Sequence, residues 1–351
     1  MNKRYLLIYH KEDNDGVFSA AIFYYHLINE LNVEKENITL MGADYNLLSY
    51  YAASHTPKDL KEIYDIIIIT DISFNSEYMK ELYNEYNANF IWCDHHKPII
   101  DASQKYHFSD CPGIRNTQKS AILCAYEFLY DPFNECYSSV NKHQHFLFPE
   151  LFRILSGWDS WSYEREGYEF DYVRNVNKGV TYTFKLDFNK VLEQVSKIIH
   201  IYVNNPGYDN VLEETNLIKH MHEIGKTLNE YDDNVMADII KNSGDCTWKV
   251  KIEDEEIDHY IEHSACAIFY QGATNSTMFK SLKTKGINHG LVFKRQADGN
   301  WVLSMYNVNE YEWLHCGEFL KEKYGGGGHK GAAGCTLTED QFINILKCKT
   351  I

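Results

Sequence analysis

The first hundred residues alternate short apolar runs with amphipathic segments, and this alternation restricts the possible folds more than any other feature of the sequence. The run "DIIIIT" at 65–70 is typical of a strand buried on both faces of a parallel sheet. The alternation as a whole predicts strands at 5–9, 38–45, 65–70 and 90–93 and helices at 16–31, 57–64 and 75–86. Strands that alternate with helices imply crossover connections, so we expect an α/β fold with a mostly parallel sheet.

The rest of the chain follows two further patterns. Residues 118–243 are predicted to be mainly helical, whereas in the tail "GLVFKR" and "WVLSMY" flank an Asp298-Gly299 turn signal and predict a hairpin. Because 351 residues exceed one ordinary core, we expect more than one domain. The expected organisation is an α/β domain at 1–190, a helical connector at 191–244 and a smaller mixed α/β domain at 245–351.

The charge balance limits the ligands that this chain can bind. With 34 basic and 50 acidic residues the formal charge is −16, which disfavours a long nucleic-acid duplex as partner, since duplex-binding proteins normally present a basic surface. The acidic excess favours a small or short anionic ligand, or metal ions that supply the missing positive charge. Solubility alone is the simpler explanation of the same composition.

The cysteines and the apolar runs indicate the compartment. The nine cysteines are scattered without a CxxC pair, so we expect free thiols in a reducing environment. The opening apolar run ends at His10, too early for a signal sequence, and no run reaches the length of a membrane span. These features predict a cytoplasmic protein without a membrane partner. They leave the oligomeric state open, with a dimer among the alternatives.

Polar residues gather directly after the predicted strands, where the carboxyl ends of parallel strands meet at one edge of a sheet. They are His10, Asp13 and Asp15 after the first strand, Asp71 after the isoleucine run, and Asp94, His95 and His96 after "FIWC". Imidazole mixed with carboxylate, without thiolate, is a ligand set for manganese, cobalt or iron. So many carboxylates would repel one another unless cations neutralised them, and two ions fit better than one. Asp159, in "GWDSW", is expected at the end of a helix between two tryptophans.

Each of these residues alone has a simpler explanation. Asp13 and Asp15 could cap the helix that begins near Gly16, and Asp71 could cap the helix that follows it. A single histidine such as His10 is more often structural than a ligand. The joint pattern favours a functional site, because the simpler explanations would have to coincide at three strand ends in the same order.

Several motifs together resemble those of the DHH phosphoesterases, a family that includes RecJ-type exonucleases, oligoribonucleases, cyclic-dinucleotide phosphodiesterases and, more distantly, family II inorganic pyrophosphatases. The four motifs of the catalytic domain are found as "HKEDNDGVFSA" (10–20), "TDIS" (70–73), "DHH" (94–96) and "GWDSW" (157–161). The string "GGGGHKGAAG" (325–334) is similar to the glycine-rich motif of the companion DHHA1 domain. The resemblance spans nearly the whole chain, and it implies a catalytic domain at 1–190 and a substrate-binding domain at 245–351.

The resemblance implies a role for each motif residue. Two divalent ions, with manganese as the expected metal, would be bound with Asp71 as the shared ligand. His96 would face the scissile phosphate, and Asp94 would orient its neighbours. The ligands implied are His10, Asp13 and Asp71 for one ion, and Asp15, Asp71, His95 and Asp159 for the other.

The resemblance also implies a substrate site in the C-terminal part. Gly326, Gly327, Gly328 and His329 would hold a phosphate or base through close backbone approach, although a flexible hinge is an alternative explanation of the glycines alone. The strand 301–307 lacks the arginine that many DHHA1 domains carry, which makes Arg295 on the preceding strand the candidate in its place. The expected activity is metal-dependent hydrolysis of short single-stranded oligonucleotides or small nucleotides. A cyclic-dinucleotide phosphodiesterase and a non-catalytic nucleotide sensor are the alternatives.

Overall fold

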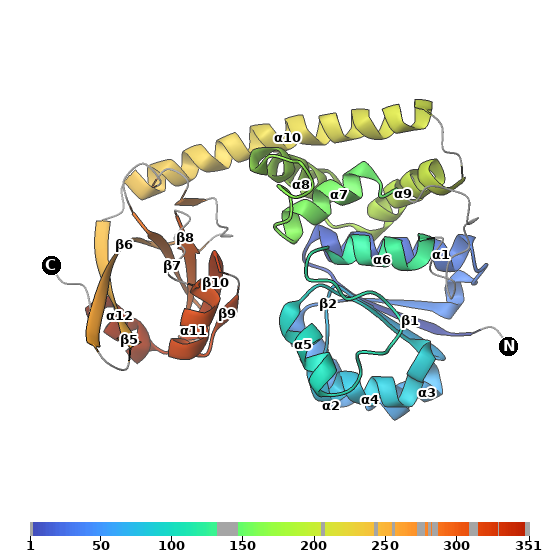
Figure 1. The fold of residues 1–351 in the computed structure, drawn as a ribbon, viewed down its shortest axis with the longest axis horizontal. Coiled ribbons are helices and arrows are strands. Elements are labelled where there is room, and N and C mark those ends of the chain that lie inside the picture. Colours follow the sequence, from blue (N-terminus) through green and yellow to red (C-terminus); the bar gives the residue numbers. More distant parts are fainter. Residues whose placement is uncertain are drawn as a thin grey trace. The chain divides into compact units, whose positions relative to one another are not determined.

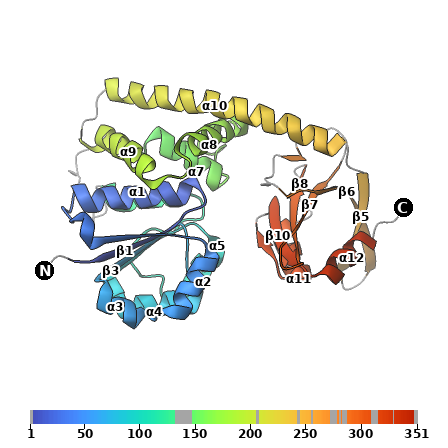
Figure 2. The same cartoon turned by 180° about the vertical axis from the view of Figure 1, so that it is seen from behind.

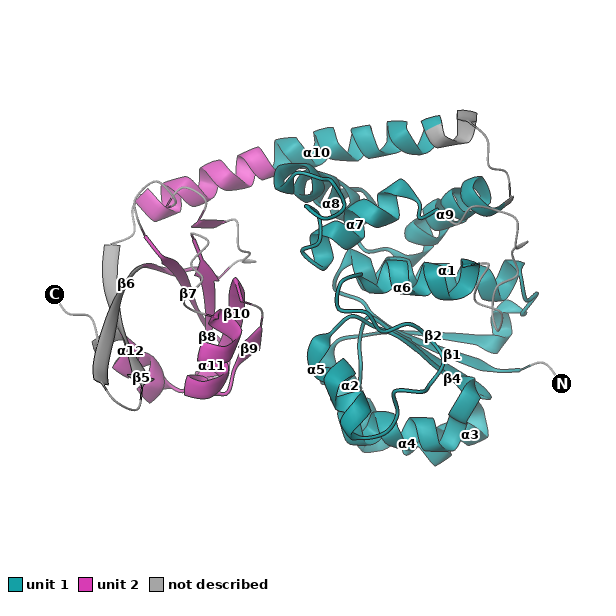
Figure 3. Cartoon of the chain, viewed as in Figure 1, with its two compact units in different colours: residues 1–228 teal, residues 229–351 magenta. Residues whose placement is uncertain are grey.

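The structure, a computed structural model, describes residues 3–131, 147–204, 208–241, 245–254, 257–271, 278–279, 282, 287–308, 315–328 and 330–347. The chain forms two compact units, Met1–Leu228 and Asn229–Ile351, which Figure 3 distinguishes by colour. The division falls within the long helix α10 (Tyr208–Lys241), whose first part belongs to unit 1 and whose last turns belong to unit 2. Each unit contains its own sheet, and we describe the two separately.

Unit 1 is built on a four-stranded sheet of strand order β2-β1-β3-β4. All three strand pairings in it are parallel, which confirms the α/β fold expected from the alternating pattern. The strands are β1 (Tyr5–His10), β2 (Ile38–Ala43), β3 (Ile66–Thr70) and β4 (Phe90–Cys93). Helices cover both faces, as Figures 1 and 2 show from opposite sides.

The two faces of the sheet have separate apolar cores. Along β1, Leu7 packs on one side, whereas Leu6 and Ile8 pack on the other, as the two-residue period of a strand requires. The first core lies against α1 (Asn14–Asn29), α6 (Ala121–Tyr130), α7 (Glu150–Asp159), α8 (Phe170–Phe184) and α9 (Phe188–Ile199). The second lies against α2 (Tyr45–Ser54), α3 (Pro57–Ile63), α4 (Ser76–Tyr86) and α5 (Lys97–Lys105).

The main difference from the expected elements lies at the end of β2. The strand ends at Ala43 rather than at residue 45, because the Asp44 carboxylate accepts a hydrogen bond from the Leu47 amide and starts helix α2. Neither α2 nor α5 follows from the apolar periodicity, since only Leu48 of α2 and Ser103 of α5 are fully buried. Short helical turns at Lys35–Asn37, Asn87–Asn89 and His200–Asn204 complete the unit.

Unit 2 contains a six-stranded mixed sheet of order β5-β6-β7-β8-β10-β9. Strands β6 and β7 are parallel and the other pairs are antiparallel. One face packs against α11 (Cys316–Tyr324) and α12 (Glu339–Lys347), and the other packs against the last turns of α10. The strands are β5 (Asp245–Asp254), β6 (Ile257–Phe269), β7 (His289–Arg295), β8 (Trp301–Asn307), β9 (Gly327–Gly328) and β10 (Ala332–Leu337).

The hairpin predicted in the tail is confirmed. Strands β7 and β8 pair antiparallel, and the Gly299 backbone, with φ of +89°, closes the turn between them. In the described part of the chain, Cys93, Cys111, Cys124, Cys266, Cys316 and Cys335 are free and buried. None of the helices in that same part is long and apolar enough to cross a membrane.

Candidate metal centre

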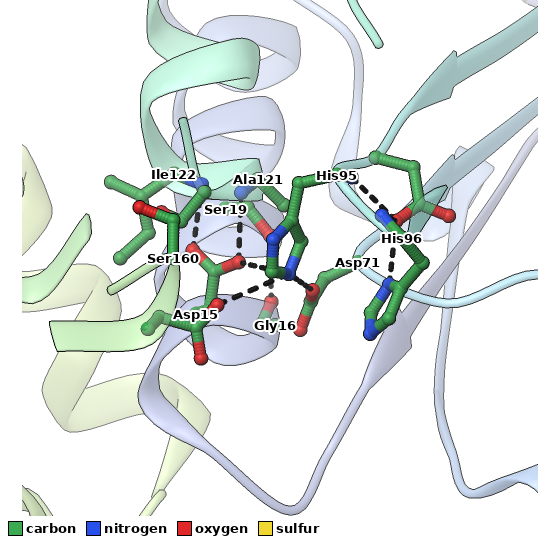
Figure 4. Close-up of polar contacts among 12 residues, drawn as sticks. Asp15, Gly16, Ser19, Asp71, His95, His96, Ala121, Ile122 and Ser160 are labelled. Carbon is green, nitrogen blue, oxygen red and sulfur yellow. Dashed lines mark hydrogen bonds and ion pairs between the residues drawn. The ribbon is translucent and has the colours of Figure 1, made fainter. Parts of the chain in front are cut away.

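The polar residues that follow β1, β3 and β4 meet at the carboxyl edge of the parallel sheet, where the end of α7 joins them. Figure 4 shows the His95 ring between Asp15 and Asp71. Among the described residues, three groups have ligand atoms that all lie within 4.8 Å of one another. They are His10, Asp13 and Asp71; Asp71, His95 and His96; and Asp15, His95 and Asp159.

Asp71 occupies the middle of this cluster. It is 1% exposed, and neither of its carboxylate oxygens accepts a hydrogen bond from the described residues. Its Oδ1 lies 3.3 Å from His95 Nε2, and its Oδ2 lies 3.7 Å from His10 Nδ1. The backbone adopts a φ of +57°, which is uncommon for a residue with a side chain, while its amide donates to the Cys93 carbonyl on β4. The strained backbone therefore places a buried carboxylate between two histidines.

His95 joins Asp71 to a second pair of carboxylates. Its Nε2 lies 3.1 Å from Asp159 Oδ2 and 3.7 Å from Asp15 Oδ2. Asp159 is the last residue of α7, as the sequence predicted, and its Oδ2 accepts no hydrogen bond from the described residues. The imidazole of one histidine thus contacts carboxylates from three separate elements.

The capping explanation of the first motif is partly right. The Asp13 carboxylate caps α1 by accepting a hydrogen bond from the Gly16 amide, and its Oδ2 also lies 3.0 Å from His10 Nδ1. Asp15 instead accepts hydrogen bonds from the Ala121 and Ile122 amides, at 2.7 and 2.8 Å, which are the first amides of α6. Asp71 does not cap α4, the helix that follows it, because the N-cap residue of α4 is Asn75. Capping and participation in the cluster are therefore compatible for Asp13 and Asp15.

Asp94 holds the turn that carries the two histidines. The carboxylate is fully buried, and its four donors are the Trp92 indole, the His95 amide, the His96 amide and the His96 ring. Burial alone would raise the pKa of Asp94, but the hydrogen bond from the His96 ring and the other favourable contacts outweigh burial and hold the pKa below its usual range. The charged carboxylate is thus the organising centre of the motif.

The electrostatics of the cluster are those of a cation site. Burial raises the pKa of Asp71 well above its usual range and that of Asp15 to about 6, and neighbouring carboxylates add to both shifts. Burial by itself lowers the pKa of His95, but its ion pairs with Asp159 and Asp71 raise it to about 12. Protons therefore compensate the crowded carboxylates in the protein alone, and divalent cations could take their place. Buried carboxylate oxygens that accept no hydrogen bond from the described residues and lie beside imidazoles fit manganese, cobalt or iron.

One residue near the cluster was missed in the sequence. Tyr45 is the first residue of α2, and its ring centroid lies 6.0 Å from that of His10. Partial burial raises the pKa of the Tyr45 hydroxyl, and the carboxylates of Asp94, Asp71 and Asp13 add to the shift. The signal that could have revealed it is Asp44, a helix-capping residue at the end of an apolar run, which places Tyr45 at the same sheet edge.

The glycine-rich segment of unit 2 is ordered by its packing. Gly327 and Gly328 form β9 and pair with β10, and Gly326 precedes them. A Cβ on Gly326 would lie 2.4 Å from the Gly334 carbonyl oxygen, so its lack of a side chain serves close packing. The Arg295 guanidinium lies over the Trp301 ring and 3.7 Å from the Glu339 carboxylate. His329 lies outside the described residues.

Comparisons with known proteins concern the fold. No family model and no curated protein matches the chain. Among solved structures, it is similar to a pGpG-specific phosphodiesterase, PggH, from Vibrio cholerae, at 14% identity and a TM-score of 0.46, over 98% of this chain and 97% of that chain. It is also similar to an exopolyphosphatase-related protein from Bacteroides fragilis, at 13% identity and a TM-score of 0.45, over 99% of this chain and 91% of that chain. A third similar structure is the exonuclease RecJ bound to manganese, at 14% identity and a TM-score of 0.44, over 99% of this chain and 89% of that chain.

Proposed function

We propose that this chain is a phosphodiesterase that requires divalent metal ions and hydrolyses short oligonucleotides or other small nucleotides. The observation that carries the proposal is the buried Asp71 carboxylate, which faces His10 and His95 while neither oxygen accepts a hydrogen bond from the described residues. Burying an ionised carboxylate without a donor is costly, so the arrangement requires a cation or a proton to compensate it. The motifs that resemble those of DHH phosphoesterases support the same reading.

The proposed ligands divide into two sets that share Asp71. When bound, the two ions would neutralise charge that develops at phosphorus and activate water for in-line attack. The first set is His10, Asp13 and Asp71, and the second is Asp15, Asp71, His95 and Asp159.

His96 and Asp94 have roles other than metal binding in this proposal. The Asp94 carboxylate accepts from His96 Nδ1, so that nitrogen carries hydrogen and Nε2 remains for the substrate. We assign to the His96 ring, with a hydrogen on both nitrogens, a hydrogen bond that Nε2–H donates to a phosphate oxygen and that strengthens as negative charge develops there. Asp94 acts as a positioning residue, because it fixes the His96 ring and the backbone of the turn. Loss of the His96 side chain should therefore affect the chemical step more than ion binding.

The excess of 16 negative charges supports a short substrate rather than a long duplex. General electrostatic attraction for a polyanion is weak on such a chain, so affinity must come from specific contacts. The glycine-rich segment of unit 2 and Arg295 are the proposed contacts for the far end of the substrate, with residues 245–351 as the proposed substrate-binding domain.

The test is a turnover screen of the full chain with manganese. The substrates are short oligonucleotides, cyclic dinucleotides, adenosine 3′,5′-bisphosphate and pyrophosphate. We expect faster cleavage of a linear dinucleotide or trinucleotide than of any cyclic compound. Faster cleavage of a cyclic dinucleotide would favour the cyclic-dinucleotide phosphodiesterase, and binding without turnover of any substrate would favour the sensor.

The matched variants are Asp71→Asn and, as control, Asp101→Asn on the exposed surface of α5. Asp71→Asn should abolish turnover and reduce the metal content, measured by elemental analysis, from close to two ions per chain. Asp101→Asn should leave both unchanged, since the Asp101 carboxylate contacts only Lys97 among the described residues. A fully active Asp71→Asn protein with at most one ion per chain would contradict the two-metal proposal.

A further inference from the structure

The end of α7 carries an aromatic cluster beside the candidate metal centre. The rings of Trp158 and Trp161 are stacked, with centroids 6.3 Å apart and an interplanar angle of 24°. Phe170, the first residue of α8, stacks on Trp161 at 6.0 Å with the same angle. Trp158 packs against the apolar core of unit 1, whereas Trp161 is 52% exposed. The cluster therefore holds one large aromatic ring at the surface on a firm base.

The backbone of Trp161 is strained in this position. Its φ is +54°, in the left-handed region that bulky residues rarely adopt. The turn is held by the Ser160 hydroxyl, which donates to the Ser156 carbonyl at 2.7 Å and lies 2.9 Å from the Ser162 hydroxyl. Backbone strain of this kind clusters at functional sites, where the surrounding structure holds it in place.

The aromatic cluster is connected to the site through Trp158 and Asp159. A cavity of about 200 Å³ is lined by Trp158 together with Asp15 and Asp159, two of the candidate ligands. Asp159 precedes Trp161 by two residues, and its carboxylate contacts His95. A molecule that enters this cavity therefore meets both candidate ligands and Trp158, on which the exposed Trp161 ring stacks.

The charges of the cavity beside the aromatic cluster indicate which part of a substrate could bind to the exposed Trp161 ring. Asp13, Asp15, Asp159 and Glu12 line the same cavity, so its protein walls repel a phosphate that lacks cations. A nucleobase carries no charge and presents a flat π face, and its stacking on an aromatic side chain tolerates any sequence. We propose that Trp161 is a stacking platform for one nucleobase of the substrate, adjacent to the candidate metal centre. This proposal rests on the proposed phosphodiesterase function and names the part of the substrate that this face recognises.

The experiment measures equilibrium binding, so that it does not depend on turnover. A dinucleotide with a non-hydrolysable linkage is titrated into the full chain with manganese by calorimetry, and analogues that lack one or the other base are titrated in parallel. The variants are Trp161→Leu, which keeps an apolar side chain without a π face, and Trp161→Phe, which keeps the π face. Tyr50→Leu, at a 72% exposed residue of α2, is the matched control.

Trp161→Leu should raise the dissociation constant about tenfold, within the range expected for loss of one stacked base. Trp161→Phe should retain most of the affinity, and Tyr50→Leu should match the wild type. For the wild type, the dissociation constant of one of the two abasic analogues should exceed that of the intact dinucleotide by a similar factor. For Trp161→Leu, that analogue and the intact dinucleotide should have equal dissociation constants. This non-additivity is the result that identifies stacking on a base rather than general damage.

Three results would overturn the proposal. They are equal affinity of Trp161→Leu and wild type, an equal loss on the intact and both abasic analogues, and a change of oligomeric state in sedimentation, which would make this face an interface between two copies. If Trp161→Leu lowers the melting temperature by more than about 4 °C, Trp161→Gly replaces it, because glycine accepts the positive φ. A wild type that binds the dinucleotide but cleaves no substrate would contradict the phosphodiesterase proposal alone.

Discussion

His96 Nδ1 lies 2.7 Å from Asp94 Oδ1, whereas the neighbouring His95 turns its Nε2 away, toward Asp71 and Asp159. Two adjacent histidines on one turn thus serve different partners. The buried Asp94 carboxylate separates them, because it accepts both backbone amides as well as the His96 ring.

We predict that the two histidines differ in their effects when replaced. His95→Ala should lose one metal ion, since the imidazole contacts three carboxylates of the cluster. His96→Ala should retain the metal but lower kcat by about 10²-fold, the usual cost of one lost hydrogen-bond donor to a developing oxyanion. Elemental analysis and steady-state kinetics distinguish the two. Equal metal content and equal rates in both variants would show the assignment to be wrong.

A second prediction concerns stability and the buried His26. Burial lowers the pKa of His26 to about 4, below its value of 6.5 in the unfolded chain, and its Nδ1 has no hydrogen-bond partner among the described residues. Between these values the unfolded state binds the extra proton, so stability falls as the pH is lowered from 6.5 toward 4. The loss amounts to about 3 kcal/mol and is complete below pH 4.

Urea unfolding at several pH values measures this dependence. His26→Phe keeps an aromatic ring against Tyr130, whose centroid is 5.6 Å away, and should remove this part of the pH dependence. His220→Phe, at an exposed position on α10, should retain it. If His26→Phe and wild type lose the same stability between pH 6.5 and 4, protonation of His26 does not contribute.

A third prediction concerns Gly16, at the start of α1. A Cβ at this position would lie 2.0 Å from the His10 carbonyl oxygen, a backbone atom that cannot move aside on its own. Gly16→Ala should therefore shift α1 against the end of β1, destabilise the protein by about 1–3 kcal/mol and reduce metal binding. Gly331→Ala is the control, since no atom of the described residues lies within 4 Å of its added Cβ. Unchanged melting temperature and metal content in Gly16→Ala would show that the sheet edge tolerates the shift.

The fourth prediction concerns the C-terminal unit. If His329 contacts the far end of a nucleotide, His329→Ala should lower kcat/KM for a dinucleotide about tenfold. Hydrolysis of a small aryl phosphodiester should stay nearly unchanged, because remote contacts act only on substrates long enough to reach them. His220→Ala serves as the control. An equal loss on both substrates would mean that the segment shapes the fold or the metal site instead of the substrate contact.

Much of unit 1 could be predicted from the sequence. The period of the apolar residues is a local property, and it identified the four parallel strands and the main helices between them. The positions of the candidate ligands followed from the same pattern, because the carboxyl ends of parallel strands meet at one edge. The C-terminal end of β2 and the start of α2 were missed, since one side chain, that of Asp44, decides where the strand stops.

Only the tertiary structure decided how the residues at that edge share their contacts. Asp15 accepts hydrogen bonds from the amides of Ala121 and Ile122, more than a hundred residues away, and no local pattern encodes such a pair. The positive φ of Asp71 and of Trp161 likewise depends on neighbours that hold each backbone in a conformation it does not prefer. Residue types along a chain determine which chemistry is available, whereas packing between distant elements determines which atoms face one another. For this protein the sequence determined the donor atoms and the sheet that gathers them, and the packing of α6 and α7 against that sheet decided their partners.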